Sequence, residues 1–284
     1  MMFNQPNFII IGTQKGGTTS LYEYLIQHPQ ILPSNQKEIH FFDLQYQKGI
    51  DWYESQFASK SSPQFLTGEA SPYYIFHPLV AQRLKQHYPQ IKIIVLLRNP
   101  VDRAISQYYH EIHHKCETLS LEEAFALEST RLAGETEKIL SNPYYYSFNH
   151  QHYTYLSRGI YIDQLKNWMK YFPKKQFLIL ESEDLYKDPA LTVNKTFEFL
   201  GLPHFQLSQY EKYNAGNYPA VNERIYQYLV DYYEPHNQRL AAYLGREFTW
   251  TATTKINAKN WLRSLLGKIP FFSHYLKSKI EAKF

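Results

Sequence analysis

The sequence contains very little cysteine: among its 284 residues there is one, Cys116. A single cysteine cannot form a disulfide within the chain, which excludes a disulfide framework and fits a reducing compartment. Long apolar runs are also missing, because no segment has the roughly 18 uninterrupted apolar residues of a membrane-spanning helix. The N-terminus has no basic region and only a short apolar run, unlike a signal peptide. We therefore expect a cytoplasmic protein.

The sequence also lacks a bulk excess of charge of one sign. Its 30 Lys and Arg residues nearly balance 26 Asp and Glu residues. The basic surplus is local, since residues 251–284 contain seven Lys and Arg residues and one acidic residue, Glu281, while the preceding 250 residues are slightly acidic. This distribution does not favour nucleic acid as a partner. Any anion that the body of the protein binds must therefore be held by a local site.

Short apolar runs indicate the fold class. Three of them predict buried parallel strands: 8–11, 91–97 and 176–185. Helical patterns begin after them, near Thr19, near Val101 and over about 191–200, where Gly201 ends the last helix. Strands that alternate with helices predict an α/β fold, with a small parallel β-sheet flanked by helices.

A glycine-rich loop, GTQKGGTTS (12–20), follows the first predicted strand. Gly12 and Gly17 match the glycines of a Walker loop, but Thr18 stands where that loop has its lysine, and Lys15 lies inside the loop instead. Glycines let the backbone approach an anion, and the N–H groups at the start of the next helix point toward it. The candidate anion-binding residues are Lys15, Gly16, Gly17, Thr18, Thr19 and Ser20.

Arg98 follows the strand predicted at 91–97, where a Walker-type kinase would need an aspartate to hold Mg²⁺. An arginine at this position favours a second anion over a metal ion. Ligands of an open α/β sheet bind beyond the carboxyl ends of its strands, so Lys15 and Arg98 are expected to share one crevice. Glu181 also lies near a predicted strand end. A nucleotide-dependent kinase remains an alternative, and these residues argue against it.

Several ordered motifs resemble the sulfotransferases that use 3′-phosphoadenosine 5′-phosphosulfate (PAPS). The loop and its helix, GTQKGGTTSLYEYLIQHPQI, look like their 5′-phosphosulfate-binding loop, and LLRNPVDRAISQYYH is similar to their 3′-phosphate-binding segment. The heparan sulfate N- and O-sulfotransferase group is indicated by KEIHFFD (37–43), KGIDWYESQF (48–57) and YYEPHNQRLAAYLGREFTW (232–250). The resemblance implies a P-loop-NTPase-like sulfotransferase fold and one sulfotransferase domain over residues 1–250.

The resemblance also implies how the donor is bound. The glycine-rich loop would hold the 5′-phosphosulfate, and Lys15 would stabilise the charge that develops on the bridging oxygen as the sulfuryl group leaves. Arg98 and Ser106 would hold the 3′-phosphate, and Tyr218 would contact the nucleotide. The product would be adenosine 3′,5′-bisphosphate (PAP). No metal is expected to be required, because the transferred group carries less negative charge than a γ-phosphoryl group.

Transfer to an acceptor needs a base, because the acceptor hydroxyl or amine loses its proton as the bond to sulfur forms. Glu38 matches the catalytic glutamate of the resembling family. His40 is the competing candidate, since an unperturbed histidine titrates nearest to neutral pH. The expected acceptor is a carbohydrate or a glycolipid, with a small hydroxyl or amine metabolite as a further alternative. A non-catalytic relative that only binds a nucleotide or a membrane is disfavoured by Lys15, Arg98 and Glu38.

Two motifs depart from the family pattern. Relatives usually carry a lysine where this chain has Ala70, so either another cation substitutes or the acceptor site is less anionic than one for a heparan chain. The loop YNAGNYP (213–219) lacks the basic residues of its counterpart, which weakens the assignment of Asn214, Gly216 and Tyr218 to donor binding. We also expect neither the disulfide nor the Golgi anchor of these relatives, and therefore a bacterial-type cytoplasmic relative.

Three further patterns have competing interpretations. HEIHH (110–114) matches a zinc-hydrolase signature, but no third ligand stands out, and a packed or solvated helix face is favoured. The aromatic run 144–155 is either a stacking platform for sugar rings or a loop packed on the core. Residues 251–284 predict a basic amphipathic helical tail, which either packs on the body or contacts a membrane surface peripherally.

Overall fold

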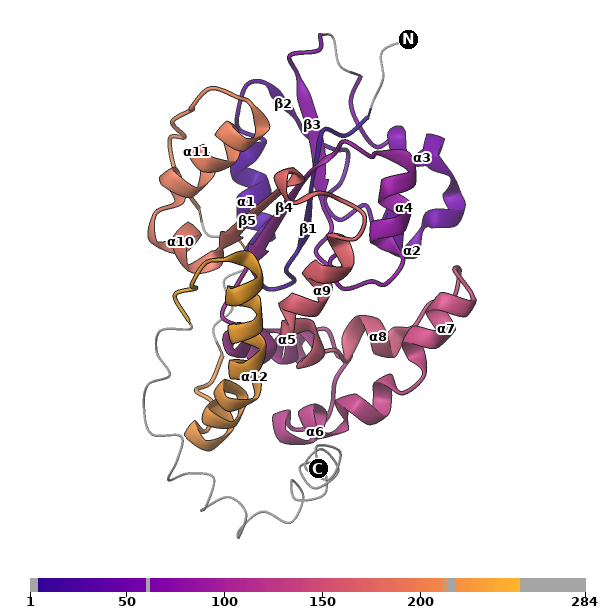
Figure 1. The fold of residues 1–284 in the computed structure, drawn as a ribbon, viewed down its shortest axis with the longest axis vertical. Helices are drawn as coiled ribbons and strands as arrows, with labels where there is room; N and C mark the ends of the chain where they lie inside the picture. Colours follow the sequence, from indigo (N-terminus) through magenta and orange to yellow (C-terminus); the bar gives the residue numbers. More distant parts are fainter. Residues whose placement is uncertain (1–4, 60–61, 212, 214–217, 251–284) are drawn as a thin grey trace.

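The structure, a computed structural model, describes residues 5–59, 62–211, 213 and 218–250. Within these residues, parallel strands form a five-stranded sheet in the order β2-β3-β1-β4-β5 (Figure 1). The strands are β1 Phe8–Gly12, β2 Ile31–Leu32, β3 Leu66–Ala70, β4 Lys92–Leu97 and β5 Phe177–Glu181. This arrangement confirms the predicted α/β class with a small parallel sheet.

Helices cover both faces of the sheet, as Figure 1 shows. On one face lie α1 Thr18–Leu25, α10 Ser182–Lys187 and α11 Pro189–Leu200; on the other lie α2 Phe41–Leu44, α3 Ile50–Glu54, α4 Val80–His87 and α9 Tyr161–Trp168. Neighbouring side chains of a strand point to opposite faces. Phe8 and Ile10 of β1 therefore pack with α1 and α11, whereas Ile9 and Ile11 pack with α4 and α9.

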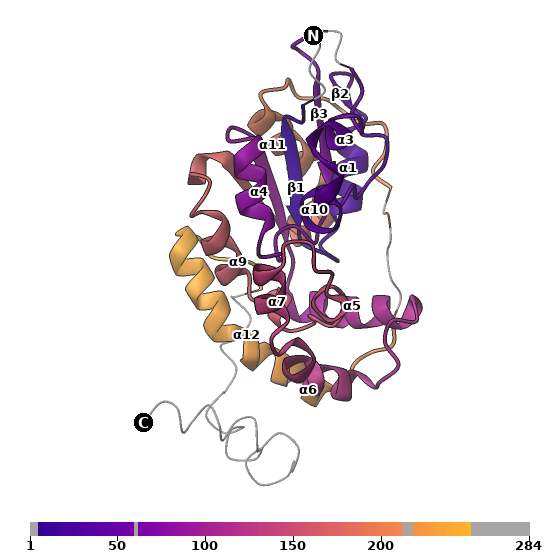
Figure 2. The ribbon, with the colours of Figure 1, turned by 90° about the vertical axis from the view of Figure 1, so that its right-hand side faces the viewer.

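A third group of helices lies beyond the carboxyl ends of the strands (Figure 2). It contains α5 Pro100–His113, α6 Leu121–Leu132, α7 Glu135–Ser141, α8 Phe148–His152 and α12 Glu223–Leu244. Its own apolar core includes Ala104 of α5, Phe125 of α6 and Tyr233 of α12, all buried. Because ligands of such sheets bind at this edge, these helices form the surroundings of the expected crevice.

Two features of the sheet differ from the sequence prediction. The strand predicted at 176–185 ends at Glu181, and Ser182–Lys187 is helix α10. Glu183 and Asp184 lie in the first turn of α10, where acidic side chains interact favourably with the helix dipole. The second difference is that β2 and β3 were not predicted. Strand β3 has the sequence LTGEA, in which a glycine and a glutamate hide the apolar pattern.

Some predictions concern residues that the structure does not describe. The predicted tail 251–284 lies outside the described residues, and so do Asn214 and Gly216 of the loop after α11. Tyr218 of the same loop is described. None of the helices in the described part of the chain is long and apolar enough to cross a membrane.

Candidate active site

The glycine-rich loop joins β1 to α1 at the carboxyl edge of the sheet. A Cβ atom on Gly16 would lie 2.7 Å from the carbonyl oxygen of Leu96 in β4, so only glycine fits between the loop and this strand. Gly17 has a positive φ of 89° and immediately precedes α1. The backbone of the loop is held in place, because the N–H of Thr13 donates to the carbonyl of Leu96 at 3.0 Å. The loop is thus a fixed backbone cradle at the start of a helix, as an anion site requires.

Lys15 and Arg98 lie together, as the sequence predicted. The guanidinium of Arg98 donates to the carbonyl oxygen of Lys15 at 2.9 Å. Burial and the nearby charge of Arg98 lower the pKa of Lys15, while the carboxylates of Glu111 and Glu38 act in the opposite direction. Two cations therefore lie close together at the carboxyl edge of the sheet, where the sequence predicts a crevice. Glu38 is close enough for its charge to act on Lys15.

Glu181, the third residue expected near a strand end, does not face this crevice. It is the last residue of β5, and its carboxylate accepts hydrogen bonds from the backbone N–H and the hydroxyl of Thr249, at 3.0 and 2.8 Å. Its second partner is Arg246, at 3.4 Å. These contacts attach the segment after α12 to the sheet, so Glu181 has a structural role.

Ser106 and Tyr218 meet at the other candidate donor position. Ser106 is fully buried in α5, and its hydroxyl lies 2.5 Å from that of Tyr218. The ring of Tyr109 stacks on the ring of Tyr218, with 5.1 Å between ring centres and 4° between ring planes. Helix α5 is positioned for this by its start, where the side chain of Asn99 accepts from the N–H of Val101 at 3.0 Å. A serine and two tyrosines thus converge beside the crevice.

Glu38 and His40 form a network of charges with Asp43. The carboxylate of Glu38 forms an ion pair with Lys37, and its Oε2 lies 3.4 Å from His40 Nε2. The other ring nitrogen of His40 lies 2.7 Å from a carboxylate oxygen of the buried Asp43. Both Glu38 and His40 have positive φ angles, 61° and 52°, so a tight turn presents the two side chains together.

These contacts shift the pKa values of Glu38 and His40 away from neutral pH, in opposite directions. Burial raises the pKa of Glu38, but the hydrogen bond from His40 and the charge of Lys37 outweigh burial and lower it to about 2. Burial lowers the pKa of His40, but the charges of Asp43 and Glu38 outweigh it and raise it to about 10. At neutral pH, Glu38 is therefore an ionised acceptor, and His40 is a protonated donor.

The turn that carries Glu38 and His40 rests on a buried polar cluster. The N–H of His40 donates to the hydroxyl of Ser71 at 3.2 Å, and that hydroxyl donates to Glu69 at 2.7 Å. Glu69 also accepts from Tyr53 at 2.9 Å and from Tyr74 at 3.1 Å. Its burial raises its pKa to about 7 against the opposing effect of these hydrogen bonds. The cluster connects the turn that carries Glu38 and His40, called the acidic turn below, to strand β3.

The Ala70 position does not open onto this cluster. Ala70 is fully buried in the core between the sheet and α1, on the opposite face of β3 from Glu69. A lysine in place of Ala70 would therefore put its charge into the apolar core unless its side chain turned out of it. Lys37, next to Glu38, is a cation that the site already holds.

Residues near Lys15 and Arg98 include Tyr186 and Arg158, which the sequence did not single out, and His110, which it singled out only within the HEIHH pattern. A Cβ on Gly17 would lie 2.9 Å from the hydroxyl of Tyr186. Burial raises the pKa of Tyr186, and the nearby charge of Arg98 partly opposes this by lowering it. The fully buried Arg158 contacts the side chain of Gln14 in the loop. Burial and the charge of Lys15 lower the pKa of His110 to about 4. Each comes from a different element, so no sequence pattern connects them.

The HEIHH pattern does not gather its two outer histidines around Glu111. His110 and His114 have ring centres 4.3 Å apart at the end of α5, and His114 is exposed. The carboxylate of Glu111 is instead 2.8 Å from a ring nitrogen of His152. Among the described residues, the group of three potential metal ligands is Glu111, Cys116 and His152, and neither outer histidine belongs to it.

A family model described as the sulfotransferase domain matches residues 5–223. Together with the parallel sheet and its glycine-rich loop, this match shows that the chain belongs to the sulfotransferase family, whose members are enzymes of the transferase class. The predicted relation to the heparan sulfate group is also confirmed by the relatives described next.

Over 86% of its length, the chain is 30% identical to the membrane-associated sulfotransferase kil1 of Dictyostelium discoideum and spans 66% of it, just under two thirds. It is 32% identical to heparan sulfate glucosamine 3-O-sulfotransferase 5 of Mus musculus, again over 86% of this chain, and spans 74% of that relative. The crystal structure of a sulfotransferase from Alicyclobacillus acidocaldarius superimposes with a TM-score of 0.70 at 31% identity, covering 87% of this chain and 98% of that one. This similarity confirms the predicted sulfotransferase fold.

Proposed function

We propose that the protein transfers the sulfuryl group of PAPS to a hydroxyl or amine group of a saccharide. The observation that carries this proposal is the position of Lys15. Its ammonium group lies within electrostatic reach of both Arg98 and Glu38. A reacting sulfur beside Lys15 would then have the donor phosphates near Arg98 and the acceptor near Glu38.

In the proposed reaction, the acceptor oxygen or nitrogen forms a bond to sulfur while the bond between sulfur and the bridging oxygen of PAPS breaks. The electron pair of the broken bond stays on the 5′-phosphate of PAP, where Lys15 stabilises the charge. The acceptor proton passes to Glu38, which then releases it to solvent. The backbone N–H groups of Gly17 and Thr18 at the start of α1 would hold the 5′-phosphate, while the N–H of Gly16 donates to the carbonyl of Thr13 at 2.8 Å and closes the loop.

The assignment of the base is supported by the charge states of the acidic turn. A histidine with a pKa of about 10 is already protonated at neutral pH, so His40 cannot accept the acceptor proton. Glu38 is ionised and can accept it, although a pKa of about 2 makes this carboxylate a weak base, so its contribution would depend on its position beside the acceptor. His40, held by Asp43, would orient Glu38 by donating a hydrogen bond to it. We therefore propose Glu38 as the base and His40 as a positioning residue.

The donor side is supported by the second set of contacts. Arg98 supplies the fixed charge for a 3′-phosphate, and the buried hydroxyl of Ser106 lies beside Tyr218. The stacked rings of Tyr109 and Tyr218 offer an aromatic surface of the kind on which a nucleotide base stacks. Since Lys15 and Arg98 provide the positive charge, we propose that transfer needs no divalent metal ion.

A saccharide acceptor is supported by exposed aromatic side chains on the acceptor side. Arg83 donates to the carbonyl of Phe42 at 2.6 Å and to that of Pro143 at 2.5 Å. It thereby connects α2, which follows the acidic turn, to the start of the aromatic run 144–155, called the aromatic segment below. Next to Pro143, Tyr144 and Tyr146 are 66% and 51% exposed, too exposed to serve as core. Aromatic rings of this kind can stack on the apolar face of a sugar.

The names of two relatives support the same acceptor class and a location. One relative is named for heparan sulfate glucosamine, which is a saccharide. Another is named as membrane-associated. We therefore propose a carbohydrate or glycolipid acceptor and peripheral membrane contact through residues 251–284, which lie outside the described residues. We also propose a cytoplasmic location, because a sequence with one cysteine fits a reducing compartment.

A thermal-shift comparison tests the donor assignment, because a ligand that binds the native state raises its stability. PAP without magnesium is expected to raise the Tm more than ATP with magnesium does. The opposite ranking would contradict the proposal and favour a kinase. Transfer of labelled sulfate from PAPS to a panel of oligosaccharides and small metabolites then tests the acceptor class. Label on a small metabolite but on none of the sugars would contradict a saccharide acceptor.

A further inference from the structure

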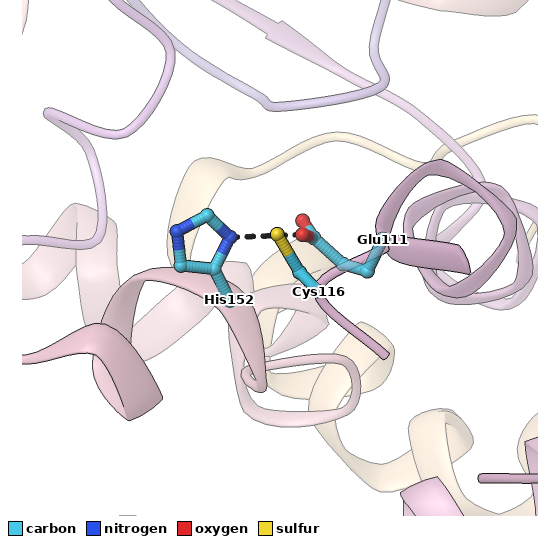
Figure 3. Close-up of side chains that lie close together, drawn as sticks. All are labelled: Glu111, Cys116 and His152. Carbon is cyan, nitrogen blue, oxygen red and sulfur yellow. Dashed lines mark hydrogen bonds and ion pairs between the residues drawn. The ribbon is translucent and has the colours of Figure 1, made fainter. Parts of the chain in front are cut away.

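Three side chains with metal-binding atoms meet between α5 and α8, outside the set of residues used for sulfuryl transfer. Figure 3 shows Glu111, Cys116 and His152 pointing toward one another. The carboxylate oxygen, the sulfur and the ring nitrogen all lie within 4.8 Å of one another, and the carboxylate oxygen is 2.8 Å from the Nδ1 of His152. Glu111 and Cys116 lie five residues apart at the end of α5, and the tertiary fold brings His152 of α8 to them.

The backbone around the cluster holds the three side chains in place. The N–H of Cys116 donates to the carbonyl of Glu111 at 2.9 Å, through a turn in which Lys115 has a positive φ of 60°. His152 is attached to α5 by Gln107, whose side-chain amide donates to its carbonyl at 3.3 Å. Two independent backbone contacts thus bring the ligand atoms toward the same point, which favours a preformed site.

Glu111 is the unusual member of the cluster, because its side chain is buried in α5 with only 2% of its surface exposed. A buried carboxylate requires a cationic or hydrogen-bonding partner. His152 supplies one, and the sulfur of Cys116 lies on the same side. A cation placed among the three atoms would satisfy the carboxylate and the sulfur together.

We propose that Glu111, Cys116 and His152 bind a transition-metal ion of the Zn²⁺ type. A thiolate, an imidazole and a carboxylate are ligands of Zn²⁺, whereas Mg²⁺ and Ca²⁺ prefer oxygen ligands alone. Metal–ligand bonds of about 2.0–2.3 Å separate neighbouring ligands of a tetrahedral ion by more than three ångströms, so the carboxylate and the ring must move slightly apart. The fourth position would be open to water.

The surroundings of the histidine fit this assignment. Metal-bound histidines usually donate their second ring nitrogen to another group. Here the Nε2 of His152 lies 3.4 Å from the hydroxyl of Tyr146, a weak contact that can shorten once Nδ1 binds the ion. The site also joins α5 to α8, so a bound ion would connect the helix of the donor site to the aromatic segment.

Cobalt(II) titration of the reduced full-length chain tests the proposal. Cobalt(II) occupies Zn²⁺ sites and gives an intense near-ultraviolet band when a thiolate binds it. Because the sequence has one cysteine, such a band can only come from Cys116. We expect one equivalent of cobalt to produce the band and Zn²⁺ to displace it. Saturating Zn²⁺ should raise the Tm by roughly 5 °C.

Two variants test Cys116 and His152 as ligands. Cys116→Ser should abolish the band, and His152→Ala should weaken cobalt binding on the order of 100-fold or more. His114→Ala is the matched control, because it removes a histidine of the HEIHH pattern that is not a member of the cluster. Absence of the band at saturating cobalt in the wild-type chain would overturn the proposal. A band that survives His152→Ala unchanged, or that is lost in His114→Ala, would overturn the proposed ligand set.

Discussion

The proposed donor side and the proposed acceptor side of the site are built in different ways. On the donor side, the backbone does most of the positioning, since Gly16 fits against the carbonyl of Leu96 and Arg98 donates to the carbonyl of Lys15. On the acceptor side, side chains position one another. Glu38 and His40 have mutually shifted pKa values, and their turn rests on the buried carboxyl of Glu69.

This difference predicts different consequences of mutation. Changes on the acceptor side should alter proton transfer and acceptor binding while the backbone cradle of the donor remains intact. Changes to Lys15 should affect turnover more than binding, because its charge is needed most as the bridging oxygen becomes negative. Separate measurements of PAP affinity and of turnover can therefore distinguish the two sides.

The largest effect is expected for Glu38→Gln. The amide keeps the size of the side chain but cannot accept the proton, so kcat should fall about 10³- to 10⁴-fold. PAP affinity, measured by calorimetry, should stay within about threefold of the wild type, since the donor cradle is untouched. Glu122→Gln on the exposed side of α6 is the matched control. A parallel loss of PAP binding in Glu38→Gln would remove the distinction between the two sides.

Lys15→Gln should reduce kcat by about 10²- to 10³-fold, because one preorganised charge at the developing negative oxygen is lost. The loss in PAP affinity should be smaller than the loss in kcat, as single-turnover kinetics and calorimetry would show. Lys48→Ala, which changes an exposed lysine next to Trp52, is the control. If Lys15→Gln turns over at the wild-type rate, the lysine has no part in the chemistry.

Glu69→Gln should change how stability depends on pH. The folded pKa of Glu69 is about 7, above its ordinary value of 4.5, so the folded protein holds an extra proton between these values. Stability from this group is present at low pH and is lost as pH rises through 7, by up to about 3 kcal/mol. Urea unfolding at several pH values should show this loss in the wild type and less of it in Glu69→Gln. Identical slopes would contradict the assignment.

The smallest effect is expected for Tyr144→Ala. Loss of one stacking ring should raise the KM for an oligosaccharide roughly five- to tenfold and leave PAP affinity unchanged. Tyr243→Ala on α12, away from the aromatic segment, should leave both quantities unchanged. An unchanged KM in Tyr144→Ala would mean that the exposed aromatic side chains do not bind the acceptor.

The residues of the proposed donor side could be picked out from the sequence because they lie close together in it. Glycines, hydroxyls and one lysine follow each other within the loop 12–20, and Arg98 comes directly after an apolar strand. A residue such as Tyr186 could not be predicted, since only the packing of α10 brings its hydroxyl over Gly17. Strand β3 could not be predicted either, because tertiary packing requires a glycine in it. A Cβ on Gly68 would lie 2.4 Å from the carbonyl oxygen of Phe8 in β1, so the two strands can approach only if residue 68 is glycine, which weakens the apolar strand pattern.

The acceptor side could be predicted only in part. Glu38 and His40 are visible because their short segment resembles known relatives. Their charge states depend on Asp43 and on burial, which follow from the folded structure. The cluster around Glu69 joins Tyr53 and Tyr74 from other segments, and nothing in the spacing of these residues indicates it.

We propose that donor and acceptor react beside Lys15, within electrostatic reach of Arg98 and Glu38. The most direct measurement follows sulfate label from PAPS into an oligosaccharide while PAP is measured in the same reaction, with wild type and Glu38→Gln compared at equal PAP occupancy. We expect one labelled sugar for each PAP formed by the wild type, and almost none of either product from the variant. Equal transfer by the variant, or PAP formed without a labelled sugar, would contradict the claim.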